Sequence, residues 1–415
     1  MFALVDAVAF YASAEKVFDP SIRNKPVVVL TNNDGCICAV CPIARELNIP
    51  KFEPYFKLKN YLAKHNVIVR SSNYELYADL SDRMMNVIGR YCSNQHVYSI
   101  DESFLQFNSQ APDWFKLGQE IRLAVWREVK LPVGVGFGIT PTLAKAANHA
   151  AKKLYGYNGV AVISDSKQAL PILKQMKLAD VWGIGSRLSK RLELIGLNNA
   201  YDLAQQDPSK MRKFHSIVLE KTVRELNGEV CLSWDEVKQD KKEIFSTRSF
   251  GTRITDKSSL HAALNTHADI IGRKLRKQGS LVKKLTIFAH NSPHDAQFIK
   301  RSFLYEFIVP TSDTSVIANA VSSVLDKLFV ANVPFYKCGL GAIELHSGNF
   351  TQFSLFDKSQ DKPEVMRIYD QINSKYGTGT TFIASSNMTE KWSMRRAFLS
   401  PQYTTRWAHL PEINC

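Results

Sequence analysis

Two adjacent carboxylates, Asp101 and Glu102, lie at the junction of two short β-prone runs within residues 97–107. This pattern predicts a hairpin whose tip carries both acids. Carboxylates this close repel one another unless a cation or a proton lies between them. A further acid, Asp6, ends the apolar run Phe2–Val5, which has the composition of a buried strand. One strand-end acid and an acidic pair would suit two Mg²⁺ ions, which prefer a few carboxylates together with substrate phosphates.

Each part of this pattern also has a plain structural explanation. An Asp-Glu pair in a hairpin is often a solvated turn, and an Asp that follows a strand is often the N-cap of a helix. The residue types and their spacing therefore leave a metal site, a solvated turn and a helix cap open.

The elements that must position these acids are strands that alternate with amphipathic helices in the first third of the chain. Strands separated by helical patterns predict an α/β or α+β domain. After the last of these strands, Thr140 and Pro141 predict a helix start, with Thr as the N-cap and Pro at the first helical position. The predicted strands are residues 2–5, 26–30, 67–69, 98–107 and 133–138.

The helix that follows Thr140 has two different faces. Its apolar residues recur at helical spacing and predict a buried stripe, while polar and cationic residues line another face. One side is suited to packing and the other to meeting anions. The stripe comprises Leu143, Ala146, Ala147 and Ala150, and the polar face comprises Lys145, Asn148, His149 and Lys152.

Composition indicates a globular chain with an anionic partner. The 415 residues are 45% hydrophobic, which is enough for two to four domains. The formal net charge is +14 and favours nucleic acid, with an acidic membrane surface as the competing explanation. No apolar run approaches the roughly 20 residues that span a bilayer, and the start lacks signal-peptide features. We therefore expect a cytoplasmic protein with no membrane partner.

The seven cysteines indicate a reducing compartment. They are odd in number and scattered, which favours free thiols over disulfides. The cluster Cys36, Cys38 and Cys41 could bind a metal, but no second Cys or His pair follows at zinc-finger spacing. Buried or strand-facing thiols are the preferred interpretation.

Two later segments predict contacts with a nucleic-acid backbone. Gly183 and Gly185 form a Gly-x-Gly turn before a basic helix that begins near Arg187, a pattern that brings backbone N–H groups to a phosphate. A plain turn between helices is the alternative. Further on, strand candidates at 244–250 and 284–290 flank a basic helix, which predicts a small α/β module with a cationic face.

Several motifs, in order along the chain, resemble the UmuC branch of the Y-family translesion DNA polymerases. The resemblance covers essentially the whole chain. Its residues are Asp6 with Phe10-Tyr11-Ala12-Ser13, Asn32 to Cys36, Ser72 to Asp79, Ser99 to Glu102, Leu143 to Lys153 and Leu399 to Arg406.

The resemblance implies an α+β multidomain fold of the right-hand polymerase type. Its parts would be a palm, small fingers, a helical thumb with a helix-hairpin-helix-like turn, an α/β little finger and a C-terminal partner-binding extension. The expected ranges are 1–22 and 79–168 for the palm, 23–78 for the fingers, 169–237 for the thumb, 238–346 for the little finger and 347–415 for the extension.

The resemblance also implies the roles of individual residues. Asp6 and Asp101 would bridge both Mg²⁺ ions, the carbonyl of Ala7 would complete the nucleotide-metal site, and Glu102 would serve the primer-side metal. In the metal-bound state the pKa of these carboxylates should be depressed. Tyr11 would be the steric gate that excludes a 2′-hydroxyl, and Arg45 and Lys152 would contact the triphosphate, since Arg binds phosphate as a fork and Lys as a point charge.

Partners follow from the same resemblance. Primed, damaged DNA would be held through Gly183, Gly185, Arg187, Arg248 and Lys284, with deoxynucleoside triphosphates as the second substrate. The pattern Gln352-x-Ser354-Leu355-Phe356 resembles a sliding-clamp-binding peptide, which would act as a short linear anchor. A processed UmuD-type dimer and a RecA filament are the remaining implied partners.

The chain departs from the family pattern near the nucleotide pocket. Val8 occupies a position that is usually polar or acidic, and Val40 to Ile43 replaces a stretch that is usually Arg-Asn-Ala-Glu. No metal ligand is lost, so we expect an active, error-prone polymerase of the SOS response. The alternative is a catalytically weak scaffold that binds DNA and the clamp.

Overall fold

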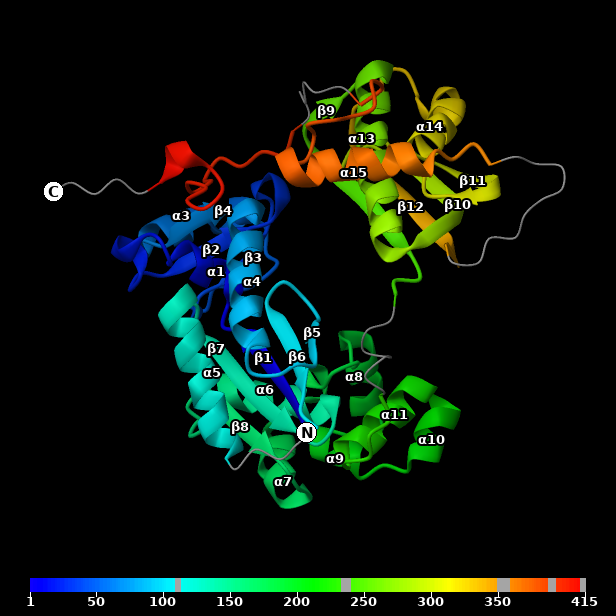
Figure 1. Cartoon of the computed structure of the whole chain (residues 1–415). Coiled ribbons are helices and arrows are strands. Elements are labelled where there is room, and N and C mark those ends of the chain that lie inside the picture. Colours follow the sequence, from blue (N-terminus) through cyan, green and yellow to red (C-terminus); the bar gives the residue numbers. More distant parts are fainter. Residues whose placement is uncertain (109–112, 233–239, 349–358, 387–392, 411–415) are drawn as a thin grey trace. The chain divides into compact units, whose positions relative to one another are not determined.

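The computed structural model describes residues 1–108, 113–232, 240–348, 359–386 and 393–410. The chain forms two compact units, which Figure 1 colours along the sequence. The first unit comprises Met1–Gln239 together with Arg396–Cys415, and the second comprises Asp240–Arg395. The predicted extension 347–415 is therefore divided between the two units. None of the helices in the described ranges combines the length and apolarity that a bilayer-spanning helix needs.

A five-stranded sheet forms the centre of the first unit. The central strand β1 pairs antiparallel with β6 on one side and with β7 on the other. β1 is almost wholly buried, as its apolar composition predicted. In sheet order the strands are β5 (Gln95–Val97), β6 (Glu102–Gln106), β1 (Phe2–Ala7), β7 (Val133–Gly138) and β8 (Val160–Ile163).

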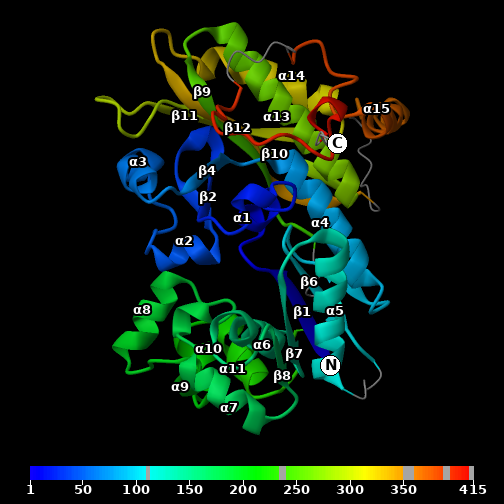
Figure 2. The same cartoon turned by 90° about the vertical axis from the view of Figure 1, so that its left-hand side faces the viewer.

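Helices cover both faces of this sheet (Figure 2). α5 (Trp114–Val129) packs on one face of β7 and β8, beside α4 (Tyr74–Gly89), and α6 (Pro141–Lys153) packs on the other face. α6 lies very close to β7 because the residues of β7 that face it are glycines. A Cβ atom on Gly136 would lie 2.0 Å from the backbone nitrogen of Asn148. The glycine stripe thus fixes the height of α6 above the sheet.

A second, smaller sheet lies in the region predicted as fingers. Its strands are in the order β3-β2-β4, and β2 is buried throughout because it is the central strand. Two elements of the predicted palm range, α1 (Phe10–Glu15) and η1 (Pro20–Ile22), precede it. The elements of the predicted fingers are β2 (Val27–Leu30), η2 (Asn32–Asp34), β3 (Ile37–Val40), α2 (Pro42–Glu46), α3 (Tyr55–Lys64) and β4 (Ile68–Ser71).

Short helices follow the main sheet and share a core with α6. Polar residues cap most of their N-termini, as in α7, where the Asp165 side chain accepts a hydrogen bond from the Gln168 N–H. These elements are α7 (Ser166–Gln175), η3 (Leu178–Asp180), α8 (Ser186–Leu194), α9 (Ala200–Ala204), α10 (Pro208–Phe214) and α11 (Ile217–Leu226), and a last turn, η4 (Trp407–His409), lies in the C-terminal part of the unit.

The second unit is an antiparallel four-stranded sheet with helices α13 (Lys257–Gln278) and α14 (Thr314–Leu328) packed against it. Along β10, Leu285, Ile287 and Ala289 are buried while the residues between them are partly exposed, so that face carries the core. The strand predictions at 244–250 and 284–290 are confirmed. In sheet order the strands are β11 (Lys300–Thr311), β10 (Ser280–His290), β12 (Phe335–Ser347) and β9 (Ile244–Ile254).

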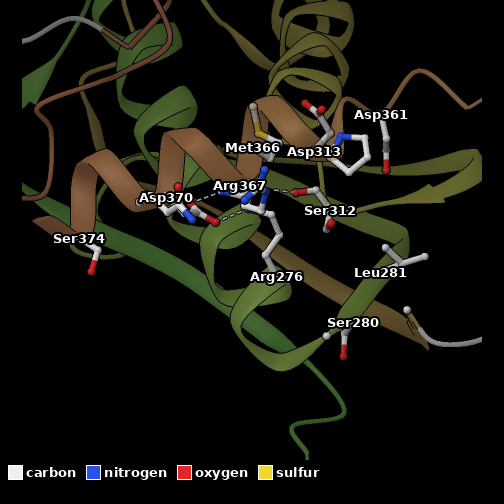
Figure 3. A pocket seen from close by; sticks show the side chains of 14 residues that line it. Arg276, Ser280, Leu281, Ser312, Asp313, Asp361, Met366, Arg367, Asp370 and Ser374 are labelled. Atoms are coloured by element: carbon white, nitrogen blue, oxygen red, sulfur yellow. Dashed lines mark hydrogen bonds and ion pairs between the residues drawn. The ribbon is translucent and has the colours of Figure 1, made fainter.

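Helix α15 (Pro363–Tyr376) completes the second unit. Arg276 of α13 binds the Asp370 carboxylate of α15 at 2.6 and 2.7 Å, and its guanidinium also donates to the Ser312 carbonyl at 2.7 Å. Figure 3 shows this arginine beneath α15, beside a cavity of about 640 Å³ that Met366 and Asp313 also line. Of the predicted site residues that the structure describes, none lines this cavity.

Candidate active site

The three predicted acids lie side by side at one end of the main sheet. Asp6 is directly opposite Glu102 in the β1–β6 pairing, and the Ala7 N–H donates to the Asp101 carbonyl at 2.9 Å. The predicted hairpin is present, but its first strand, β5, ends at Val97. The run Tyr98 to Ile100 was predicted as strand and is instead the hairpin tip, because the N–H groups of Tyr98 and Ser99 both donate to the Glu102 carbonyl.

Each of the three carboxylates is held by a hydrogen-bond donor. The Lys152 ammonium lies 2.6 Å from Asp6 Oδ1, and the Lys145 ammonium lies 3.0 and 3.2 Å from the two oxygens of Glu102. The Ser99 hydroxyl donates to Asp101 Oδ1 at 2.6 Å. Both lysines belong to α6 and are seven residues apart, so they lie on one side of the helix.

The position of Lys145 is fixed by aromatic rings as well as by Glu102. Its ammonium lies 4.4 Å from the centroid of the Tyr98 ring, 5.0 Å from that of Trp182 and 5.6 Å from that of Phe104. Such cation–π contacts stabilise a partly desolvated ammonium. The sequence placed Lys145 on the anion-facing side of its helix but did not identify Glu102 as the anion. The seven-residue spacing from Lys152 was the available signal.

The electrostatics of the site favour an added positive charge. Burial, together with the charges of Asp101 and Glu102, raises the pKa of Asp6 to about 6, against the opposing effect of the neighbouring Lys152. The pKa of an isolated aspartate is close to 4, so three carboxylates this close need cations nearby to remain ionised.

The residues at this site fit a divalent cation in their donor chemistry. Carboxylate and carbonyl oxygens are the ligands that Mg²⁺ prefers. Within the described ranges, however, no group of three His, Cys, Asp or Glu side chains is arranged as a metal cage. Two of the three carboxylates are paired with the ammonium groups of Lys145 and Lys152, which stand where positive charge is needed.

Tyr11 stands on the same side of the first unit and is held by other tyrosines. Its ring stacks on the Tyr77 ring with a centroid distance of 4.5 Å and an interplanar angle of 18°, and Tyr74 meets it edge-on at 6.2 Å. Burial raises the pKa of Tyr11 to about 12, so its hydroxyl stays neutral at physiological pH. The ring is therefore fixed in orientation by two neighbours from α4.

The stretch Val40 to Ile43, which differs from the family pattern, has a structural role in this chain. Cys41 is buried and is the N-cap of α2, where its sulfur accepts hydrogen bonds from the N–H groups of Ala44 and Val27. Arg45 follows on the exposed side of the same helix.

Cys41 and the other five described cysteines are free thiols, and Cys415 lies outside the described residues. Val8 is half-buried and donates its N–H to the Pro132 carbonyl at 2.8 Å.

The Gly-x-Gly turn has the geometry that its sequence predicted. Gly183 has a φ of +85°, which favours glycine, and Gly185 is the N-cap of α8. Gly183, Gly185 and Arg187 are all exposed. The turn thus presents the backbone at the start of a basic helix.

The structure does not bring Arg248 and Lys284 onto one face of the second unit's sheet. Lys284 alternates with the core residues of β10, so it lies on the face away from the helices, where it pairs with Glu344 at 2.9 Å. Arg248 is directly opposite the buried Cys338, and residues in such a pair share a face. Gln352, Leu355 and Phe356 of the predicted clamp peptide lie outside the described residues.

Comparisons with known proteins agree along the chain. Residues 5–149 match the family model described as the impB/mucB/samB family, and residues 241–355 match the C-terminal domain of that family. A third model, described as a domain of unknown function, matches residues 363–413.

Similar proteins of comparable length are known from bacteria. The protein UmuC of Salmonella typhimurium is 39% identical over 100% of both chains, and the protein MucB of Escherichia coli is 35% identical over 99% of both. DNA polymerase IV of Saccharolobus solfataricus is 29% identical over 50% of this chain and 59% of its own length.

Solved structures show the same fold at low sequence identity. A Y-family DNA polymerase chimera of Dbh and Dpo4 matches with a TM-score of 0.62 at 19% identity, over 82% of this chain and 98% of that one. An insertion ternary complex of Dbh DNA polymerase matches with a TM-score of 0.56 over the same shares of both chains.

Proposed function

This chain belongs to the impB/mucB/samB family, the UmuC branch of the Y-family translesion DNA polymerases, and from this premise we propose that it extends primed, damaged DNA in the SOS response by a two-Mg²⁺ mechanism. It is a DNA-directed DNA polymerase with the right-hand architecture of that family. We assign 1–22 and 79–168 to the palm, 23–78 to the fingers, 169–237 to the thumb and 238–346 to the little finger, and we place the reaction in the cytoplasm.

One observation carries the proposed mechanism. Asp6 and Glu102 are directly opposite in neighbouring strands, and Asp101 is bonded through its carbonyl to the residue after Asp6. Rigid strands therefore hold all three acids at one end of the sheet. A solvated turn or a helix cap, which the sequence left open, would not require this convergence with two lysines.

Phosphoryl transfer requires in-line positioning and neutralised charge. Asp6, Asp101, Glu102 and the Ala7 carbonyl would hold the two ions, which supply charge neutralisation at the triphosphate and the primer hydroxyl when bound. Lys152 contributes a point charge for the triphosphate, and its present pairing with Asp6 keeps it at the site. Lys145 orients Glu102 and is itself held by three rings.

The nucleotide pocket would be completed by Tyr11 and Arg45. The Tyr11 ring, fixed by Tyr77 and Tyr74, acts as the steric gate beneath the sugar and excludes a 2′-hydroxyl. Arg45 is exposed, and its guanidinium would bind phosphate as a fork. DNA would be gripped through its backbone at Gly183, Gly185 and Arg187, and in the little finger at Lys284, whereas Arg248 lies on the opposite face of that sheet.

Primer extension past an abasic site tests the mechanism. Asp101→Ala should abolish extension with Mg²⁺, because it removes a carboxylate that no neighbour replaces. Asp82→Ala removes an exposed acid of α4 and is the matched control, which should extend like the parent. Extension by Asp101→Ala at the parental rate would show that the assigned chemistry is wrong.

A second candidate is a scaffold that binds DNA and the clamp with little chemistry. It is favoured by the replaced stretch Val40 to Ile43, where Cys41 serves as a helix cap next to Arg45. Such a protein would bind duplex DNA with strong salt dependence but give no single-nucleotide incorporation with Mg²⁺ or Mn²⁺. A clear incorporation band would exclude it.

The proposed protein partners are a processed UmuD-type dimer, a RecA filament and the sliding clamp. We expect a UmuD-type dimer to co-purify with the full chain and to be lost on truncation after Asp357. Truncation after Arg395 removes only the part that belongs to the first unit, so it separates the two portions of the C-terminal region. Co-purification that survives both truncations would place the contact elsewhere.

A further inference from the structure

The segment 396–403, called here the C-terminal segment, packs on the small sheet and on α4 of the first unit. The N–H of Phe398 donates to the Ser71 hydroxyl at 2.9 Å, and its carbonyl accepts from the Ser71 N–H at 3.0 Å. The Ala397 N–H donates to the buried Asp34 carboxylate at 2.8 Å. Tyr403 stacks on Phe18 with a centroid distance of 5.1 Å. The segment is thus attached by backbone bonds and by ring contacts.

Ser400 occupies a buried position between α1 and α4. Only 6% of its surface is exposed. Its hydroxyl accepts a hydrogen bond from the Asn73 amide at 2.9 Å, and it lies close enough to the Glu15 carboxylate to lower the pKa of that acid. Asn73 is the N-cap of α4, and Glu15 is the last residue of α1. Ser400 therefore lies between the end of one helix and the start of another.

Glu15 needs this support because it is a buried acid. It is 2% exposed and accepts a hydrogen bond from the Tyr77 hydroxyl at 2.5 Å, while the nearest cation, Arg70, is 3.7 Å away. Burial raises the pKa of Glu15, and the hydrogen bond from Tyr77 and the nearby Ser400 hydroxyl act in the opposite direction. Removing one donor from a buried carboxylate is costly, since the oxygen it leaves has no water to replace it.

The helical spacing links this polar contact to the aromatic stack. Tyr11 lies four residues before Glu15 on α1, and Tyr77 lies four residues after Asn73 on α4, so each pair shares one side of its helix. α1 and α4 are consequently joined at two adjacent levels. One level is the stack of Tyr11 on Tyr77, and the other is the Ser400 bridge, in which Ser400 accepts a hydrogen bond from Asn73 and lies beside the Glu15 carboxylate.

We propose that Ser400 is a positioning residue for sugar selection, which acts on Tyr11 through Glu15, Asn73 and Tyr77. This inference rests on the proposed role of Tyr11 as the steric gate. It gives the part of the chain that matches a domain of unknown function a role in the choice of substrate. Loss of the bridge lets α1 and α4 shift, and a small displacement of the gate ring admits the 2′-hydroxyl of a ribonucleotide.

The test compares a deoxynucleotide with the matching ribonucleotide in single-nucleotide incorporation by the full chain. Ser400→Ala should lower the ratio of kcat/KM for the two sugars by roughly five- to tenfold, the size expected for the loss of one neutral hydrogen bond. Most of the change should be a lower KM for the ribonucleotide. Tyr77→Phe keeps the ring stack but removes the bond to Glu15, and should lower the ratio similarly.

Two matched variants control for general loosening of the C-terminal segment. Ser400→Thr retains the hydroxyl and should keep the parental ratio. Arg396→Ala breaks the ion pair with Glu75, whose N···O distance is 2.9 Å, but leaves the Ser400 bridge intact, and should also keep it. A Ser400→Ala protein that loses activity equally for both sugars would reveal a structural role alone and overturn the proposal.

Tyr11→Ala separates this inference from the proposed function on which it rests. If Tyr11→Ala leaves sugar selection unchanged, Tyr11 is not the gate and both ideas fall. If Tyr11→Ala admits ribonucleotides while Ser400→Ala and Tyr77→Phe behave like the parent, only the role of Ser400 is refuted. Sugar selection lost in all three variants supports the proposal.

Discussion

The two units of this polymerase differ in how they treat buried charge. Among the described residues, the first unit buries the carboxylates Glu15, Asp34, Glu220 and Glu225. Asp6, in the candidate active site, is also largely buried. The second unit buries one carboxylate, Asp313, which caps α14. Its other buried polar groups are neutral side chains such as His267 and Asn265.

This difference follows from what each unit must hold in place. A buried carboxylate is stable only with several donors of fixed geometry, so it specifies positions at a cost in stability. In the first unit Glu15 ties α1 to α4, and Glu225 ties α11 to the start of α6. The second unit is proposed to present a surface to a uniform phosphate backbone, and apolar packing would be sufficient for that purpose.

The largest effect is expected from removing a buried acid of the first unit. Glu225 has no exposed surface, and its carboxylate accepts hydrogen bonds from the N–H groups of Thr142, Cys231 and Leu232, each at 3.0 Å. Glu225→Ala leaves these three donors without partners at the start of α6 and beyond α11. We expect a loss of about 3–5 kcal/mol in the free energy of unfolding, measured by urea denaturation.

Glu229→Ala is the matched control, because that glutamate is an exposed partner of Arg224. It should change the free energy of unfolding by less than about 0.5 kcal/mol. Equal effects of the two substitutions would show that buried charge does not distinguish the first unit.

In the second unit the large effects should come from apolar residues. Leu340 of β12 is fully buried in the core against α13 and α14. Leu340→Ala should cost about 2–4 kcal/mol in unfolding free energy, through lost apolar burial and the cavity that remains. Leu304→Ala on β11 removes an exposed leucine and should be nearly neutral. Thermal unfolding followed by fluorescence and circular dichroism would compare the two variants.

How much of this contrast could be predicted from the sequence depends on how far apart along the chain the interacting residues lie. Local patterns predicted the strands around Asp6 and Gly134 and the capped start of α6, because period and capping are properties of neighbouring residues. Asn73 with Ser400 and Thr142 with Glu225 are 327 and 83 residues apart, and no local pattern reports such pairs. The strand β5 was also misplaced, since a β-prone run beside Asp101 closes the hairpin instead.

A smaller effect on stability, caused by a buried neutral base and not by a buried acid, should appear on acidification. Burial, together with the charges of Arg248 and Lys274, lowers the pKa of His267 in the second unit to about 3 from an ordinary value of 6.5. The folded state therefore keeps this ring neutral while the unfolded chain protonates it. Its contribution to stability is complete above about pH 6.5 and is lost progressively as pH falls toward 3.

Between pH 6.5 and 4.5 the parent should lose about 2 kcal/mol more unfolding free energy than His267→Gln, which cannot titrate. The comparison is between the pH slopes of the two proteins, so the stability lost by the substitution at neutral pH does not enter. Parallel slopes would mean that His267 is protonated in the folded state, contrary to its burial.

The smallest effect on stability is expected at Lys284, where the second unit would meet DNA. The side chains of Lys284 and Glu344 are both partly exposed, at 34% and 41%, and ion pairs at the surface contribute little to folding. Lys284→Ala should leave the thermal midpoint unchanged but weaken duplex binding and reduce the salt dependence of the binding constant by about one ion. Lys327→Ala, on the helical side of the sheet, should change neither quantity. Equal salt slopes for the parent and Lys284→Ala would move the DNA contact away from the open face of this sheet.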